Sequence, residues 1–224
     1  MTKVLILVTN HGTLGEEQEK NGTYAPELTH VVHELQTADI AFDIVSLNGG
    51  SAPLYGEDAE GDSVNQAVLA DSNIQAALQS TLPLAEVNPT EYDAVFYPGG
   101  FGLLYDLANS EEAGAATASV YDKGGIVAAV CHGPAGLLPV KLANGKHILE
   151  DIAATCFTYE EEKDFGTLPK IPYLLEESIT RVAGQYSKKG PWQSFVIEQE
   201  RVITGQNPQS ATGVGKALVA ALQQ

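Results

Sequence analysis

The sequence contains few cysteines and few basic residues. Cys131 and Cys156 are its only two cysteines among 224 residues, and 12 lysines and arginines stand against 29 aspartates and glutamates, a formal net charge of −17. Two cysteines do not build the framework of a small disulfide-rich domain, and we expect no disulfide in a reducing compartment. A surface this acidic repels phosphate backbones, so we expect no nucleic-acid partner.

Long apolar runs are also lacking. No stretch approaches the length that crosses a bilayer, and the run 4–8 is too short for the core of a signal peptide. We therefore expect a cytoplasmic protein without a membrane partner. The hydrophobic content of 44% and charged content of 18% are those of a globular chain, and the length predicts one domain over residues 1–224.

Short apolar strands alternate with amphipathic helices along the chain. The pattern predicts strands at 4–8, 40–47, 94–97, 126–130 and 153–157, a hairpin at 195–198 and 202–204, and helices at 25–36, 71–79, 113–121, 133–138, 173–180 and 210–222. Such alternation predicts an α/β fold with a mostly parallel central sheet covered on both faces. In these sheets the functional site lies beyond the carboxyl ends of the strands.

The strongest local signal is the segment 126–134, in which a buried strand ends at Cys131 and is followed by His132, Gly133 and Pro134. This is the pattern of a nucleophile elbow with cysteine in the nucleophile position. We expect the turn to lift the sulfur into solvent and the following helix to favour the thiolate. A small buried core residue is an equally open interpretation of Cys131 at this point.

A glycine-rich turn follows the strand 94–97. The backbone amides of Gly99 and Gly100 could approach a ligand closely and, together with the amide of His132, bind a developing oxyanion. The alternative is a tight strand-to-loop turn. His30 and His33 are spaced as a helical pair but lack a third ligand, so we expect a solvated helix face and no metal.

Several motifs together resemble one known family. The segments 97–100, 129–134, 190–192 and 204–210 are similar to those of the PfpI superfamily, which has the class I glutamine amidotransferase-like fold. Within it, the chain most resembles the branch of glutathione-independent glyoxalase III proteins, also described as holding chaperones. The resemblance implies a three-layer flavodoxin-like sandwich, a homodimer, and an enzyme that needs no cofactor.

The resemblance also implies roles for particular residues. Cys131 would be the nucleophile, His132 its adjacent base and Glu27 a carboxyl group beside the sulfur. The third member of the triad would be Glu162, with Glu161 as the alternative because three glutamates follow one another. Substrate-binding positions would be Gly99, Gly100 and Trp192.

The implied reaction converts methylglyoxal, a small dicarbonyl, to lactate. Thiolate attack on the aldehyde gives a hemithioacetal, a proton moves through an enediol, and water releases lactate from the thioester. A deglycase activity would use the same residues. Two other classes stay open on the sequence: a cysteine peptidase or amidase, and a non-enzymatic holding chaperone or redox stress protein.

Overall fold

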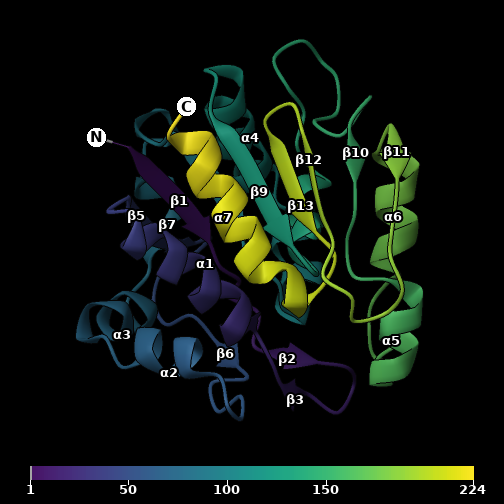
Figure 1. The fold of residues 1–224 in the computed structure, drawn as a ribbon. Helices are drawn as coiled ribbons and strands as arrows, with labels where there is room; N and C mark the ends of the chain where they lie inside the picture. The colour runs from purple at the N-terminus through teal and green to yellow at the C-terminus, as the bar shows by residue number, and fades with distance from the viewer. Residues whose placement is uncertain (1) are drawn as a thin grey trace.

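The computed structural model describes residues 2–224 and has a seven-stranded central sheet (Figure 1). The strand order is β12-β13-β9-β8-β1-β5-β7, and every neighbouring pair is parallel except β12 with β13. These strands are β1 (Lys3–Leu7), β5 (Ala41–Ser46), β7 (Leu82–Pro83), β8 (Ala94–Tyr97), β9 (Ile126–Val130), β12 (Val196–Gln199) and β13 (Val202–Gly205).

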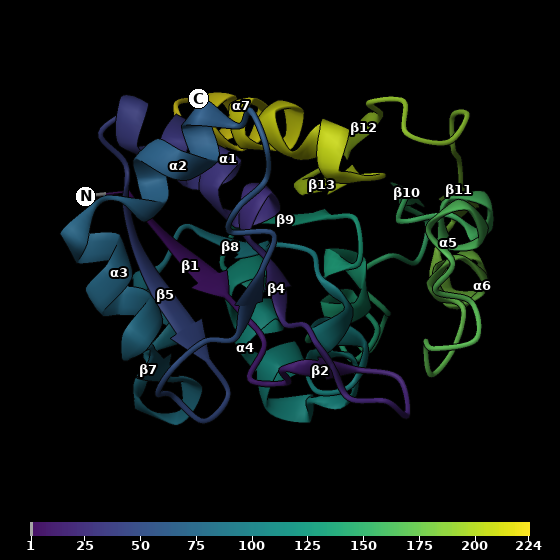
Figure 2. The same cartoon turned by 90° about the horizontal axis from the view of Figure 1, so that it is seen from below.

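Helices cover both faces of this sheet, which confirms the predicted three-layer α/β fold. Figure 2 shows α1 (Ala25–Thr37), α2 (Ser63–Leu69) and α7 (Ala211–Leu222) on one face and α4 (Glu111–Asp122) on the other. The side chains of a strand alternate between faces, so each strand supplies two cores. Along β8, Phe96 packs in the core beneath α1 and α7, whereas Tyr97 packs in the core beneath α4.

The remaining elements lie in the segments that connect the strands of the central sheet. The carboxyl-end loops carry α5 (Tyr159–Phe165), α6 (Leu175–Val182) and the paired strands β10 (Ala153–Ala154) and β11 (Gln185–Tyr186). A hairpin of β2 (Thr13–Leu14) and β3 (Glu19–Lys20) follows β1, and β4 (Thr23–Tyr24) pairs with β6 (Leu54–Tyr55). The one α-helix not yet named, α3 (Ser72–Gln79), adds Ile74 and Leu78 to the core beneath α1 and α7. No helix in the described part of the chain is both long and apolar enough to span a bilayer.

The local structure differs from the sequence prediction at 133–138 and at 159–165. The predicted helix at 133–138 is a short 3₁₀ segment, Gly133–Leu137, because tight contacts of Gly133 and Gly136 with Tyr97 hold this turn against β8. The run of glutamates after Thr158 begins α5, a helix that is not among those predicted from the pattern. Thr158 and Glu161 form a reciprocal capping box at its first turn, a strong signal for a helix start.

Candidate active site

The turn after β9 holds Cys131 in an unusual backbone conformation. Its φ is +60°, a left-handed value that residues other than glycine seldom adopt and that is found at nucleophile elbows. Two backbone hydrogen bonds hold it there: the Cys131 amide donates to the Gly205 carbonyl, and the Phe157 amide donates to the Cys131 carbonyl, both at 2.9 Å. These bonds to β13 and to the chain after β10 hold Cys131 in its strained backbone conformation.

The electrostatic expectation for the thiol is wrong in direction. Cys131 is only 4% exposed, so the turn does not lift its sulfur into solvent. Burial and the neighbouring Glu27 carboxyl raise the pKa of Cys131 well above its ordinary value. The 3₁₀ segment that follows is too short to counter this desolvation with a helix dipole. A thiol in this state would need an adjacent base to ionise it before it could act as a nucleophile.

His132 is placed to be that base. Its Nδ1 lies 3.4 Å from the Cys131 sulfur, and its Nε2 lies 2.7 Å from Oε1 of Glu162. A Glu162 carboxylate accepts a hydrogen bond from the Nε2–H group, which leaves the Nδ1 lone pair facing the thiol. The imidazole packs between the rings of Phe101 and Phe157, whose centroids lie 4.4 and 4.7 Å away, so its orientation is constrained from both sides.

The structure separates the two adjacent glutamates. Glu162 is 1% exposed, and besides His132 it accepts a hydrogen bond from the Thr167 hydroxyl. Glu161 points elsewhere and makes no hydrogen bond to His132; it accepts hydrogen bonds from Thr158 and from the backbone amide of Trp192. The geometry of a Cys131–His132–Glu162 triad is therefore present, and Glu161 lies outside it.

Glu27 lies in the first turn of α1 with its carboxyl group beside the sulfur. It is fully buried, and neither carboxyl oxygen has a hydrogen-bond partner that meets normal geometry within residues 2–224. Burial raises its pKa from 4.5 to about 8, although the nearby Cys131 thiol and Gly99 amide oppose the shift. A carboxyl group with this pKa exchanges protons close to neutral pH, which suits a general acid–base catalyst.

The two predicted glycines lie behind the site rather than on its open surface. A Cβ on Gly99 would overlap the Glu27 carboxylate and lie 2.8 Å from the Cβ of Cys131. Gly100 has φ +120° and packs against the backbone of 22–24. Neither glycine lines the cavity over Cys131, so their predicted contact with substrate stays a prediction. The absent side chain of Gly99 leaves room for the Glu27 carboxyl beside Cys131, and that of Gly100 lets the segment 22–24 approach.

A small cavity of about 130 Å³ opens over the sulfur. Its floor contains Cys131, His132 and Glu27, and Trp192 lies in its wall, where a substrate-binding residue is expected. Its other lining residues are mostly aromatic: Tyr24, Tyr55, Phe101, Phe157, Phe165, Pro208 and Gln209. This volume is below the roughly 300–1,000 Å³ of pockets for drug-sized ligands, so the site suits a molecule of a few heavy atoms.

Most of the aromatic residues that line the cavity, called the aromatic wall below, were not identified from the sequence: Tyr24, Tyr55, Phe101, Phe157 and Phe165. Phe165 is 58% exposed at the end of α5, with its ring centroid 6.2 Å from those of Phe101 and Trp192. In the sequence Phe165 is simply an apolar residue before Gly166, a pattern typical of an ordinary helix end. Tyr24 and Tyr55 come together because β4 pairs with β6, a contact between segments about 30 positions apart that no local pattern indicates.

The other residues considered from the sequence lie outside this site. Cys156 is fully buried in the core beneath α4. His33 is exposed as expected, whereas His30 is partly buried, with its ring nitrogens 2.8 Å from Thr212 Oγ1 and from Asp62 Oδ2. Within residues 2–224, no three histidine, cysteine or acidic side chains gather as a metal site would require.

Comparison with known proteins places this geometry in a context. The model of the DJ-1/PfpI family matches residues 19–221. The chain is 31% identical to Glyoxalase 3 of Candida albicans, over 100% of this chain and 99% of that one. Among solved structures, Rapid Encystment Protein 24 kDa of Francisella tularensis has a TM-score of 0.94 and 37% identity, with 99% of each chain covered. The crystal structure of glyoxalase III from Candida albicans has a TM-score of 0.83 and 25% identity, covering 98% of this chain and 97% of that one.

Proposed function

The chain belongs to the DJ-1/PfpI family, and from this membership we propose that it is a glutathione-independent glyoxalase that converts methylglyoxal to lactate. The observation that carries the mechanism is the meeting of three groups at one small cavity. A buried thiol, a histidine oriented by a carboxylate, and a carboxyl group with a pKa of about 8 line its floor.

The first step that we propose forms a bond between the Cys131 sulfur and the aldehyde carbon. His132 Nδ1 takes the thiol proton as the sulfur attacks, and the imidazolium is stabilised by Glu162. The carbonyl oxygen then takes this proton and gives a hemithioacetal. The raised pKa of Cys131 means that little thiolate is present before substrate binds. In this order of events the thiolate forms only when a carbonyl is in place to react with it.

The second step moves a proton between the two carbons. The ionised form of Glu27 removes the hydrogen from the former aldehyde carbon, and the electrons pass to the neighbouring ketone to give an enediol. The hydroxyl proton of the first carbon passes to the oxygen of the second, and Glu27 returns its proton to that second carbon, which gives a lactoyl thioester. The first carbon has been oxidised and the second reduced, so no external electron acceptor is needed. Water then adds to the thioester, the carbon–sulfur bond breaks, and lactate leaves.

The shape of the cavity favours this substrate class over peptides. A volume of about 130 Å³ ringed by aromatic side chains admits a three-carbon dicarbonyl and is small for several residues of an extended peptide. The large exposed apolar side chains in the described residues are Leu82 on β7 and Tyr159 and Phe165 at opposite ends of α5. Nothing in this arrangement favours a client-binding patch as the main function.

The remaining expectations from the sequence belong to the same proposal. We propose one domain over residues 1–224 that works as a cytoplasmic homodimer, needs no cofactor, and binds neither nucleic acid nor a membrane. The net charge of −17 supports the exclusion of nucleic acid. A deglycase activity would use the same thiol and is compatible with the same site.

The test compares three activities of the purified protein. With methylglyoxal and no glutathione, we expect lactate to form catalytically, whereas a fluorogenic peptide is not hydrolysed. Lactate formation no faster than the uncatalysed background would refute the proposal. Peptide hydrolysis lost in Cys131→Ala would favour the amidase alternative, and suppression of client aggregation that survives the same substitution would favour the chaperone.

A further inference from the structure

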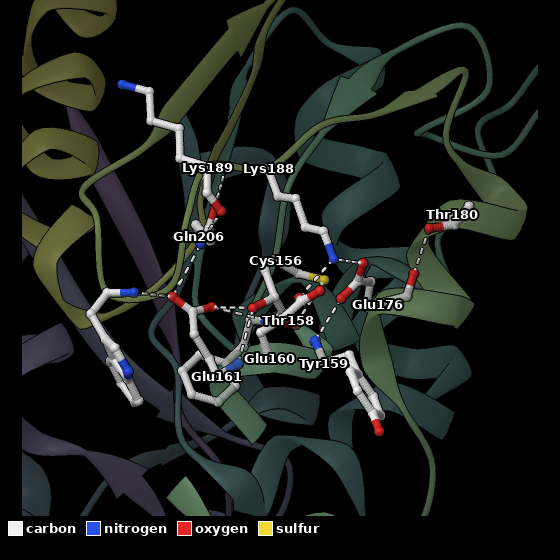
Figure 3. A network of polar contacts seen from close by, with 12 residues as sticks. Cys156, Thr158, Tyr159, Glu160, Glu161, Glu176, Thr180, Lys188, Lys189 and Gln206 are labelled. Carbon is white, nitrogen blue, oxygen red and sulfur yellow. Dashed lines mark hydrogen bonds and ion pairs between the residues drawn. The ribbon is translucent and has the colours of Figure 1, made fainter. Parts of the chain in front are cut away.

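The buried carboxylate of Glu161 accepts five hydrogen bonds from three separate segments of the chain. Its Oε2 accepts from the Thr158 amide at 3.0 Å and hydroxyl at 2.9 Å. Its Oε1 accepts from the Trp192 amide at 2.9 Å, from Gln206 Nε2 at 3.1 Å and from Asn207 Nδ2 at 2.8 Å. Figure 3 shows this carboxylate between Thr158 on one side and Gln206 on the other.

These donors connect the start of α5 to the wall of the cavity. Trp192 itself lines the cavity, and Asn207 directly precedes two further lining residues, Pro208 and Gln209. On the other side of the carboxylate, α5 carries Glu162 and Phe165. One side chain therefore joins the helix that orients the proposed base to the loops that enclose the substrate.

Trp192 needs such a support. Its φ is +61°, a left-handed conformation that is costly for a bulky residue and persists only where neighbouring contacts hold it. The indole meets Phe157 edge-on at 5.6 Å between centroids and lies 6.2 Å from Phe165. Among the contacts of its backbone, the amide donates to Glu161. Loss of that bond would release the residue from its strained position.

The hydrogen bonds of Glu161 require a side chain that accepts on two oxygens, as a carboxylate does. All five donors are neutral, and no ion pair joins Glu161 to a basic residue in the described part of the chain. Burying this charge is costly, and only full hydrogen bonding makes it tolerable. A carboxylate accepts on both oxygens, so it serves Thr158 and the Trp192 loop at once, whereas an amide accepts on only one.

We propose that Glu161 is a positioning residue that sets the place of Trp192 in the cavity wall and thereby the affinity for the dicarbonyl. Glu162, its neighbour in the chain, acts on the base instead. The statement about affinity rests on the proposed glyoxalase function, and the statement about Trp192 does not. The two adjacent glutamates then affect different kinetic constants, Glu161 acting on KM and Glu162 on kcat.

The test uses Glu161→Gln, with Glu160→Gln as the matched control, because Glu160 lies one position earlier, is exposed, and pairs with Lys188. Trp192 is the only tryptophan, so intrinsic fluorescence reports its surroundings alone. In Glu161→Gln we expect red-shifted emission and stronger acrylamide quenching. We also expect KM for methylglyoxal to rise about tenfold, the effect of one lost hydrogen bond to a charged group, and kcat to stay within about twofold. Glu160→Gln should match the wild type.

A milder variant keeps the test decisive if Glu161→Gln does not fold. Gln206→Ala removes one of the donors on the Trp192 side and leaves Thr158 and the Glu162–His132 pair intact. It should move fluorescence and KM in the same direction by a smaller amount. Unchanged fluorescence and KM in the folded variants would overturn the proposal, and so would a fall in kcat at constant KM. If the wild type makes no lactate, the glyoxalase proposal fails, but the fluorescence still decides the position of Trp192.

Discussion

The unpaired, buried carboxyl of Glu27 should make the protein less stable as the pH rises. Its pKa is about 8 in the folded protein, against 4.5 for an unperturbed glutamate. Between these two values the folded state holds a proton that the unfolded chain has released. Because stability rises with pH only where the unfolded state binds more protons, this group lowers the free energy of unfolding as pH increases. The loss begins above about pH 4.5 and is complete above about pH 8.

The size of the effect follows from the same two values. They differ by about 3.5, and 1.36 kcal/mol for each pKa unit gives an upper limit of ~5 kcal/mol. Glu27→Gln removes the titration, so the variant should lack this slope. Both proteins are best compared in a Cys131→Ala background, because the adjacent thiol titrates against the carboxyl.

Urea unfolding at pH 5 and pH 9 measures the difference directly. Relative to Glu27→Gln, the protein with Glu27 should lose several kcal/mol between the two pH values, up to the limit of ~5 kcal/mol. Glu198→Gln serves as the control, since that carboxylate is exposed on β12 and its removal should leave the slope unchanged. If Glu27→Gln shifts the unfolding free energy by the same amount at both pH values, Glu27 is already ionised at neutral pH. Its proposed role as a proton carrier would then fail.

Two further substitutions test the triad and the glycine behind it. Glu162→Gln should lower kcat for lactate formation by about 10²- to 10⁴-fold and leave KM within about twofold. The amide has one acceptor oxygen, for which Thr167 competes, so His132 loses the partner that fixes its tautomer. A fall in kcat of less than about threefold would exclude a triad role. Gly99→Ala should destabilise the fold by ~1–3 kcal/mol and abolish activity, because the new Cβ overlaps the Glu27 carboxylate. Thermal unfolding and the lactate assay measure these two effects. A stable and fully active variant would contradict the described packing.

The elbow and the main sheet could be predicted from the sequence because their signals are local. The strands 94–97 and 126–130 match β8 and β9, since continuous apolar runs bounded by glycine and proline leave little ambiguity. Helix α1 begins at Ala25, the predicted start, and a proline in the first turn favours a helix start at this position. Glu27 and Cys131 come from distant positions and meet because the carboxyl ends of parallel strands share one edge.

The choice between Glu161 and Glu162 could not be made from the sequence. Successive residues of a helix point about 100° apart, so a shift of one position directs the side chain to a different neighbour. Only the placement of α5 relative to β9 shows that Glu162 meets His132. The prediction of a favoured thiolate failed for a related reason: burial depends on the packing of Glu27 and the aromatic wall, and desolvation outweighs the short 3₁₀ turn.

One sulfur, that of Cys131, carries the proposed reaction, and the two cysteines provide a matched pair to test this. Cys131→Ser and Cys156→Ser each replace a buried thiol, but only Cys131 lines the cavity with His132 and Glu27. The measurement is lactate formation from methylglyoxal without glutathione. We expect Cys156→Ser to keep the activity of the wild type and Cys131→Ser to fall to the uncatalysed background. Lactate formation by Cys131→Ser at the rate of the wild type would contradict the account.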